Sequence, residues 1–245
     1  MAEKPPHDDL FDADFARRRE AARKQLDAID PARRGKQLAD PKRQQWFEAV
    51  YQLAGGDAAG VPWGNLAPHP LLADWLAQNP ELAGVTALDV GCGLGDNAAA
   101  LAGRGARVTA FDFAPRAVDW ARGRFAGKKI DFVVADLFAS PPGWREAFDL
   151  VHETYTLQAL PGELMPAMRQ ALASFVKPGG RLLAISRARD DHQQIDGPPW
   201  PLARRDIEAF GDCGLVLESL DDALSGPAGI RYWRALFRKP LVKER

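Results

Sequence analysis

The residues with the clearest chemical signature in this chain form a glycine-rich turn, LDVGCGLGD, at positions 88–96. The turn follows a short apolar run and precedes a helical pattern. Glycines let a ligand approach bare backbone, and the first turn of a helix offers unpaired N–H groups and a positive dipole end. This order predicts a site for a nucleotide-like ligand, with Gly91, Cys92 and Gly93 at its base. The turn alone is also typical of plain strand–helix connections.

Spacing and charge distinguish the ligands that such a turn could bind. A dinucleotide site has the pattern G-x-G-x-x-G, in which the third glycine allows close packing of helix and strand. Here the third glycine, Gly95, comes one position early, and Asp96 stands where the packing residue is expected. Asp89 precedes the turn, where a carboxylate would repel a pyrophosphate but would suit an ammonium and a sulfonium. These features favour S-adenosylmethionine over a dinucleotide.

Two further acids follow apolar runs. Asp112 comes 21 residues after Gly91, close to the spacing of about 20 expected for an acid that binds ribose hydroxyls. Asp136 precedes Leu137, a pairing that could hold an adenine amino group and cover the ring face. Because the carboxyl ends of parallel strands share one edge of a sheet, we predict that Asp89, Asp112 and Asp136 converge on one adenosyl group.

Apolar runs rich in Val, Ile, Leu and Phe alternate with helical patterns, as is typical of fully buried parallel strands. The predicted strands are 86–90, 107–112, 130–136, 148–153 and 181–186, with helices at 96–102, 115–125 and within 161–176. After a helical segment at 202–210, the runs 215–220 and 230–238 have only a turn between them, which predicts an antiparallel pair. The sequence therefore predicts an α/β fold with a doubly wound, mostly parallel seven-stranded sheet and a C-terminal antiparallel hairpin.

The N-terminal segment 1–45 differs in composition from the predicted single domain at 46–245. Between residues 17 and 43 it has ten basic and four acidic residues, and apolar residues at 11, 15, 22, 26 and 29 share one helical face. This predicts a charged helical extension, broken at Pro31 and Gly35, that lies over the ligand as a lid. A nucleic-acid arm is disfavoured, because no aromatic residues interleave the basic cluster.

Composition excludes several other classes. The net charge is −1, and the start of the chain, MAEKPPHDD, lacks the features of a secretory signal. No run approaches the roughly 18 apolar residues of a membrane-spanning helix. The two cysteines give no reason to pair, and no Cys/His cluster has metal-ligand spacing. We expect a cytoplasmic protein without metal, membrane or nucleic-acid partner; the oligomeric state is not predicted.

Residues 86–186 resemble class I S-adenosylmethionine-dependent methyltransferases, because they carry the D-x-G-C-G-x-G turn, both later acids and a KPGG turn at 177–180. Within that class the chain is most similar to the thiopurine and halide/thiol methyltransferase group. That likeness rests on GVPWG at 60–64 with the preceding Trp46, the run FDLVHETY at 148–155, and GPPW at 197–200. The chain departs from the group by lacking its second N-terminal tryptophan and by having Thr154 in place of a tyrosine.

The resemblance implies a Rossmann-like class I fold in which the segment bearing Trp63 closes over the cofactor. An indole face also attracts a methylsulfonium. The predicted cofactor contacts come from the two tryptophans, the glycine turn and the strand ends: Trp46, Trp63, Asp89, Gly91, Cys92, Gly93, Asp112, Phe113, Asp136, Leu137 and Glu153.

Candidate catalytic residues lie at the end of the fourth predicted strand: His152, Glu153 and Tyr155. The first two point to opposite sides of the strand, so we expect Glu153 to face the ligands and His152 to be its structural counterpart. His69 and His192 are weaker candidates, more typical of structural or solvated histidines. A thiol or halide acceptor needs alignment and desolvation more than a base, whereas a hydroxyl or amine more often needs one.

The predicted function is therefore methyl transfer from S-adenosylmethionine to a small molecule, with a sulfur or halide nucleophile as the first hypothesis. O- or N-methylation of a secondary metabolite is the alternative within the same class. An NAD-linked oxidoreductase and a non-catalytic methyltransferase-like binding module are the alternatives from other classes.

Overall fold

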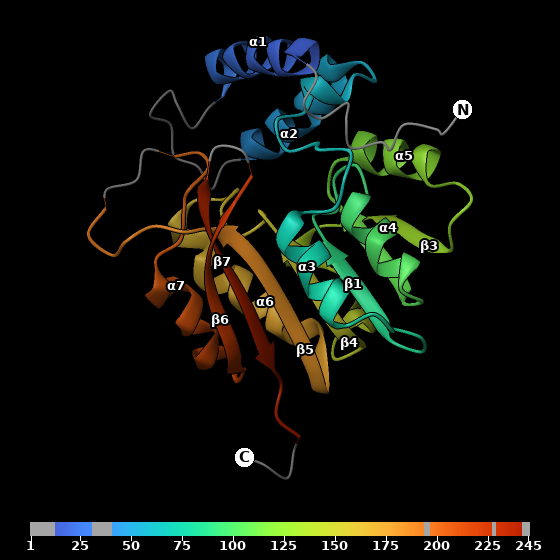
Figure 1. Ribbon diagram of the computed structural model, residues 1–245, viewed down its shortest axis with the longest axis vertical. Helices are drawn as coiled ribbons and strands as arrows, with labels where there is room; N and C mark the ends of the chain where they lie inside the picture. The colour runs from blue at the N-terminus through green and yellow to red at the C-terminus, as the bar shows by residue number, and fades with distance from the viewer. Residues whose placement is uncertain (1–12, 31–40, 194–196, 227–228, 242–245) are drawn as a thin grey trace.

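A seven-stranded sheet in the order β3-β2-β1-β4-β5-β7-β6 is the centre of the protein. The computed structural model (Figure 1) describes residues 13–30, 41–193, 197–226 and 229–241. Neighbouring strands are parallel from β3 to β5, and β7 is antiparallel to both β5 and β6. The strands are β1 (Thr86–Val90), β2 (Arg107–Asp112), β3 (Ile130–Val134), β4 (Phe148–Thr154), β5 (Val176–Arg187), β6 (Val216–Ser225) and β7 (Ile230–Arg238).

Helices cover both faces of the sheet and one of its ends. They are α1 (Ala13–Ile29), α2 (Pro41–Ala54), α3 (Pro70–Gln78), α4 (Asp96–Gly103), α5 (Pro115–Arg124), α6 (Met165–Phe175) and α7 (Arg204–Glu208). On one face Leu72, Leu101 and Val118 join the core, and on the other Met168 and Ile207 do. In Figure 1, α1 and α2 lie beyond the carboxyl ends of the parallel strands.

Local sequence explains where several helices begin. Pro115 starts α5 and Pro166 lies in the first turn of α6, where the missing proline N–H costs nothing. The sequence does not decide whether Pro166 lies at the start of its helix or kinks it; in the structure Pro166 lies in the first turn. His69 caps α3 by accepting the Leu71 N–H at Nδ1, 3.2 Å away. Helix α1 buries Phe15 and Leu26 of the predicted apolar face, whereas Ile29 at its end is exposed and Phe11 lies outside the described residues.

The predicted fold is confirmed, and the differences are at element ends. β3 stops at Val134, two residues before the predicted end, because Asp136 instead caps a short 3-10 turn at Leu137–Ala139. β5 starts at Val176, since the KPGG segment continues pairing with the chain after β7 through the Gly179 N–H and the Lys239 carbonyl, 2.8 Å apart. The predicted helix breaks at Pro31 and Gly35 lie outside the described residues. None of the helices in the described ranges is long and apolar enough to cross a membrane.

Candidate functional site

A large cavity opens at the carboxyl ends of the parallel strands, beneath α1 and α2. Its volume is about 1450 Å³, and its walls come from the glycine turn, the loops after β2 to β5, and α1 and α2. Sites for one drug-sized ligand are typically about 300–1,000 Å³. The cavity is therefore large enough for a cofactor and a second small molecule side by side.

The glycine turn forms the floor of the cavity and admits no side chain at its first position. Gly91 has φ +62°, and a Cβ there would lie 2.5 Å from the Oγ1 of Thr156. Gly95 has φ +84°, and its Cβ would approach the Phe132 ring and Ala121 to about 3 Å. Gly95 thus allows the close packing of helix and strand. In the dinucleotide pattern G-x-G-x-x-G that role belongs to the third glycine, which would fall one position later, at Asp96.

Asp112 faces the cavity from the end of β2. Its Oδ2 accepts the Gly93 N–H and its Oδ1 accepts the Ala114 N–H, both at 3.0 Å. Burial raises the pKa of Asp112 to about 6, although the backbone donors oppose that shift. Each carboxylate oxygen keeps a further lone pair. The side chain is therefore held rigidly where it can accept hydrogen bonds from two ribose hydroxyls.

The loop after β3 forms an apolar wall with one acid at its start. Asp136 lines the cavity and accepts the Phe138 N–H at 2.9 Å. Leu137, Phe138 and Phe113 line the same region. Flat apolar side chains beside one carboxylate suit an adenine ring with its amino group.

Asp89 does not lie at the cavity with Asp112 and Asp136. The expectation that all three acids converge on one adenosyl group is therefore wrong for Asp89. Asp89 is 1% exposed and does not line the cavity. Asp89 and His152 are register partners on β1 and β4, so their side chains share one face of the sheet. The Asp89 Oδ1 lies 2.6 Å from the His152 Nδ1, and the Thr154 Oγ1 lies 3.0 Å from the other ring nitrogen. His152 is thus the structural partner that the sequence suggested.

Glu153 differs from expectation as well, because it lies beneath the cavity. It is fully buried, and its Oε2 accepts the N–H groups of Thr156 at 3.1 Å and Leu157 at 3.3 Å. Burial raises its pKa to about 8. Glu153 therefore holds the turn after β4 in place and does not line the cavity.

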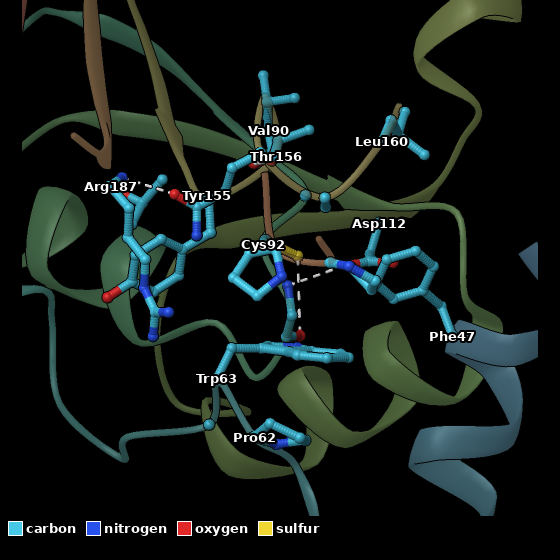
Figure 2. A pocket seen from close by; sticks show the side chains of 18 of the residues that line it. Phe47, Pro62, Trp63, Val90, Cys92, Asp112, Tyr155, Thr156, Leu160 and Arg187 are labelled. Carbon is cyan, nitrogen blue, oxygen red and sulfur yellow. Dashed lines mark hydrogen bonds between the residues drawn. The ribbon is translucent and has the colours of Figure 1, made fainter. Parts of the chain in front are cut away.

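Trp63 lies across the cavity as its aromatic wall (Figure 2). Its Nε1 donates to the Tyr51 hydroxyl at 2.9 Å. The Trp63 ring centroid lies 5.5 Å from that of Phe47 and 6.0 Å from that of Trp46. All four residues line the cavity, so the structure brings both predicted tryptophans to it. Phe47 is an aromatic contact that the sequence analysis missed.

Tyr155 lines the other side of the cavity, together with Tyr232 and His69. Tyr155 adopts φ +71°, a strained value for a non-glycine residue, and its hydroxyl lies 3.2 Å from that of Tyr232. Burial and the neighbouring hydroxyl raise the pKa of Tyr155. Burial lowers the pKa of His69 to about 3. Its Nδ1 already accepts the Leu71 N–H, so the neutral ring carries its proton on Nε2.

Sequence reasoning also missed residues that come together only in space. Arg187 ends β5, Tyr232 lies opposite it on β7, and Gln158 follows β4; all three line the cavity. The alternation along β7 was the only available signal for Tyr232. His192 is exposed and does not line the cavity, whereas Pro198 and Pro199 do.

The cavity fits S-adenosylmethionine by several observations. It combines a bare glycine backbone, two acids for the ribose and adenine, an apolar adenine wall and an indole face beside the turn. No group of three His, Cys, Asp or Glu side chains that could hold a metal occurs in the described part of the chain.

Residues 87–180 match the protein family described as "Methyltransferase domain". A ubiquinone biosynthesis O-methyltransferase of Xanthomonas euvesicatoria pv. vesicatoria is 39% identical over 131 residues, which cover 51% of this chain and 53% of that protein. Its counterpart in Xylella fastidiosa is 37% identical over 121 residues, 47% of each chain. The chain thus spans about half the length of the curated relatives it matches.

Two solved structures share the fold over most of the chain. One, described as "Conversion of a Disulfide Bond into a Thioacetal Group during Echinomycin Biosynthesis", has a TM-score of 0.66 at 26% identity and covers 81% of this chain and 93% of its own. The other is the Burkholderia thailandensis 1,6-didemethyltoxoflavin-N1-methyltransferase with bound S-adenosylhomocysteine. It has a TM-score of 0.64 at 18% identity, and the match covers 84% of this chain and 92% of the methyltransferase chain.

Residues 87–180 thus match a methyltransferase domain, and the fold is that of class I S-adenosylmethionine-dependent methyltransferases. The comparisons do not support the narrower resemblance, because the curated relatives are described as ubiquinone O-methyltransferases and not as thiopurine or halide/thiol methyltransferases. The glycine turn and strand acids are common to the whole class. They therefore identify the class and leave the acceptor open.

Proposed function

We propose that this protein transfers a methyl group from S-adenosylmethionine to a hydroxyl oxygen of a small molecule. The observation that carries the proposal is a cavity with two unlike halves. One half has the glycine turn, Asp112 and Asp136, and the other has Tyr155 and Tyr232 beside the ends of β4 and β5. The curated relatives, described as O-methyltransferases, support oxygen as the acceptor atom.

The cofactor half binds and orients the methyl donor. Asp112 would accept the ribose hydroxyls and Asp136 the adenine amino group, while the backbone at Gly91 to Gly93 lies against the rest of the molecule. When bound, S-adenosylmethionine supplies an electrophilic methyl group on a sulfonium. Trp63 would cover the positive charge with its ring face and exclude water from the reacting atoms.

The acceptor half offers hydrogen-bond donors instead of a strong base. Tyr155 has a raised pKa and keeps its proton near neutral pH, and His69 is neutral with its proton on Nε2. The guanidinium groups of Arg19 and Arg187 face Tyr155 and oppose the rise of its pKa. The same positive field would lower the pKa of an acceptor hydroxyl, which would lose its proton to solvent and react as the oxyanion. This favours a phenolic hydroxyl, with an ordinary pKa of about 10, over an aliphatic alcohol.

A panel of phenols, catechols, aliphatic alcohols, amines, thiols and iodide tests the proposal by the release of S-adenosylhomocysteine. We expect turnover with phenols or catechols and at least tenfold lower kcat/KM with aliphatic alcohols. Turnover restricted to thiols, iodide or amines would overturn the oxygen assignment. Absence of heat on titration with both S-adenosylmethionine and S-adenosylhomocysteine would overturn the methyltransferase itself.

A sulfur acceptor is the second candidate. It is favoured by the similar structure whose description concerns conversion of a disulfide bond into a thioacetal group. A thiol needs no base, because a thiol of pKa near 8.5 can bind as thiolate. Thiols in the same panel decide between the two candidates.

A further inference from the structure

Arg187 projects into the cavity, and no acidic side chain of the described residues pairs with it. It is the last residue of β5 and lies directly opposite Tyr232 in the β5–β7 ladder, so both side chains share one face of the sheet. Its main-chain N–H donates to the Oε1 of buried Gln158 at 2.6 Å, which fixes the strand end. Figure 2 shows Arg187 beside Tyr155, on the side of the cavity away from Asp112.

The guanidinium of Arg187 has no negatively charged partner in the part of the chain that the structure describes. Among the described residues its side chain has no ion pair and no hydrogen bond, and its buried Nε has no partner. Other partly buried arginines are balanced: Arg124 pairs with Asp96 at 2.7 Å, and Arg234 pairs with Asp221 at 2.8 Å. An uncompensated cation in a desolvated site carries a free-energy cost that an anionic ligand would remove.

A second positive charge enters the cavity from α1. Arg19 lines the cavity and donates to the Asn65 Oδ1 at 2.7 Å and to the Gly64 carbonyl, which are neutral groups. Its Nε is buried without a partner in the described chain. Arg19 and Arg187 both contribute positive potential at Tyr155, from α1 and from β5. The acids Asp27 of α1 and Asp30, which follows that helix, also line the cavity, but they are not among the groups that act on Tyr155.

The walls around Arg187 are flat and mostly apolar. The rings of Tyr155 and Tyr232 lie 6.2 Å apart, and that of His69 lies 4.9 Å from Tyr232. Pro198 also lines the cavity. A planar aromatic ring can pack against such walls, and a guanidinium fork matches a carboxylate in the plane of that ring.

We propose that the methyl acceptor is an aromatic carboxylate and that Arg187 binds its carboxylate group. This inference rests on the proposed function and specifies the substrate class of the same site. Arg187 acts as a binding residue that orients the ring so that its hydroxyl points toward the cofactor half. Arg19 strengthens the positive potential at the same site.

The binding test uses the full chain saturated with S-adenosylhomocysteine, titrated with benzoate, benzamide and phenyl phosphate. We expect benzoate to bind at least tenfold more tightly than benzamide. Arg187→Gln should abolish that preference and Arg187→Lys should keep part of it, because lysine retains the charge but not the fork. Arg181→Gln is the matched control, since Arg181 lies at the other end of β5 and pairs with Glu218; it should behave as wild type.

The transfer test compares 3,4-dihydroxybenzoate with 3,4-dihydroxybenzamide. We expect Arg187→Gln to lower kcat/KM at least tenfold for the carboxylate, chiefly through KM, and to lower it much less for the amide, which loses only the effect of the charge on the pKa of its hydroxyl. The assignment is overturned if benzoate and benzamide bind equally, or if phenyl phosphate binds more tightly than benzoate. It is also overturned if Arg187→Gln weakens S-adenosylhomocysteine binding as much as benzoate binding, because Arg187 would then hold the cofactor's own carboxylate.

These outcomes are distinct from failure of the proposed function. Transfer to the amide as fast as to the carboxylate leaves the methyltransferase intact and overturns only the substrate class. Selective binding of benzoate through Arg187 without methyl transfer to any acceptor leaves the anion site intact and overturns the reaction. Thermal unfolding of each variant, compared with Arg181→Gln, separates loss of binding from loss of folding.

Discussion

The two halves of the cavity differ in how their polar groups are satisfied. In the cofactor half the Asp112 carboxylate already accepts two backbone N–H groups, and Asp136 accepts one. In the acceptor half Arg187 has no polar partner for its side chain among the described residues, and Tyr155 is held at φ +71°. One half is complete before a ligand arrives, and the other has charge that a ligand must balance.

This difference has a physical consequence for specificity. Preformed hydrogen bonds fix the acids of the cofactor half, so a ligand meets them with little further ordering. An unbalanced guanidinium favours ligands that bring an anion and disfavours those that do not. We therefore expect changes in the cofactor half to reduce cofactor affinity, and changes in the acceptor half to alter the choice of acceptor.

The largest effect should come from Asp112→Ala. It removes the acceptor for two ribose hydroxyls and releases the Gly93 and Ala114 N–H groups. Two hydrogen bonds to a charged group correspond to about 3 kcal/mol or more, so the Kd for S-adenosylmethionine should rise at least about 100-fold. Calorimetry measures it. Asp112→Asn, which keeps the shape of the side chain, should weaken the affinity for S-adenosylmethionine less than Asp112→Ala. A Kd of the alanine variant within threefold of wild type would contradict the assigned role.

Trp63→Leu should have the next largest effect and tests the boundary between the halves. The indole face should attract the sulfonium of S-adenosylmethionine but not the neutral sulfur of S-adenosylhomocysteine. Ring–cation attraction is worth about 0.5–2 kcal/mol. The substitution should therefore weaken the affinity for S-adenosylmethionine roughly 2- to 30-fold more than the affinity for S-adenosylhomocysteine. Tyr51→Phe is the control, because it removes only the hydrogen bond to the Trp63 Nε1. Equal losses for both ligands would assign Trp63 to packing alone.

A smaller effect should follow from pH. The pKa of Asp112 is raised to about 6, and the ionised carboxylate is the better acceptor for ribose hydroxyls. Protonation therefore weakens cofactor binding as the pH falls through about 6, so the Kd should rise severalfold between pH 7 and about pH 5. Titrations across this range measure the change. In Asp112→Asn the slope should vanish; an unchanged slope would point to another group.

The smallest effect on function should come from Glu153→Gln, because Glu153 lies beneath both halves. Its pKa is raised to about 8 in the folded chain from an ordinary 4.5, so the folded state binds more protons and stability falls as the pH rises between these values. Glutamine keeps the acceptor for the Thr156 and Leu157 N–H groups without the buried charge. The free energy of unfolding of the variant, measured relative to wild type, should therefore rise by at least about 1.4 kcal/mol between pH 5 and pH 8, the equivalent of one pKa unit.

Thermal unfolding at both pH values measures the relative gain of the Glu153→Gln variant. Its kcat should stay within about twofold of wild type, since the side chain does not reach the cavity. A large loss of kcat with intact folding would return Glu153 to the catalytic role that the sequence suggested.

Local pattern sufficed for the fold and for the cofactor half. Strands such as Thr86–Val90 and helices such as Pro115–Arg124 follow from apolar periodicity and proline position, both of which act over a few residues. The glycine turn and Asp112 were predicted from spacing for the same reason. Asp89 and Glu153 were expected at the cavity because they flank it in sequence. Side chains alternate along a strand, however, and the register of β1 against β4 pairs Asp89 with His152 and Val90 with Glu153, so the two acids are buried on opposite faces of the sheet and neither lines the cavity.

What the sequence alone determined was the order of strands and helices and the class of cofactor, since these depend on neighbouring residues and fixed spacings. Tertiary structure decided which charges lack partners. Arg187 and Tyr232 are 45 positions apart, and they meet with Arg19 and Tyr155 around one cavity because β5 pairs with β7 and α1 lies beyond the strand ends. Whether a charge is balanced depends on every element packed around it, and no local pattern records that.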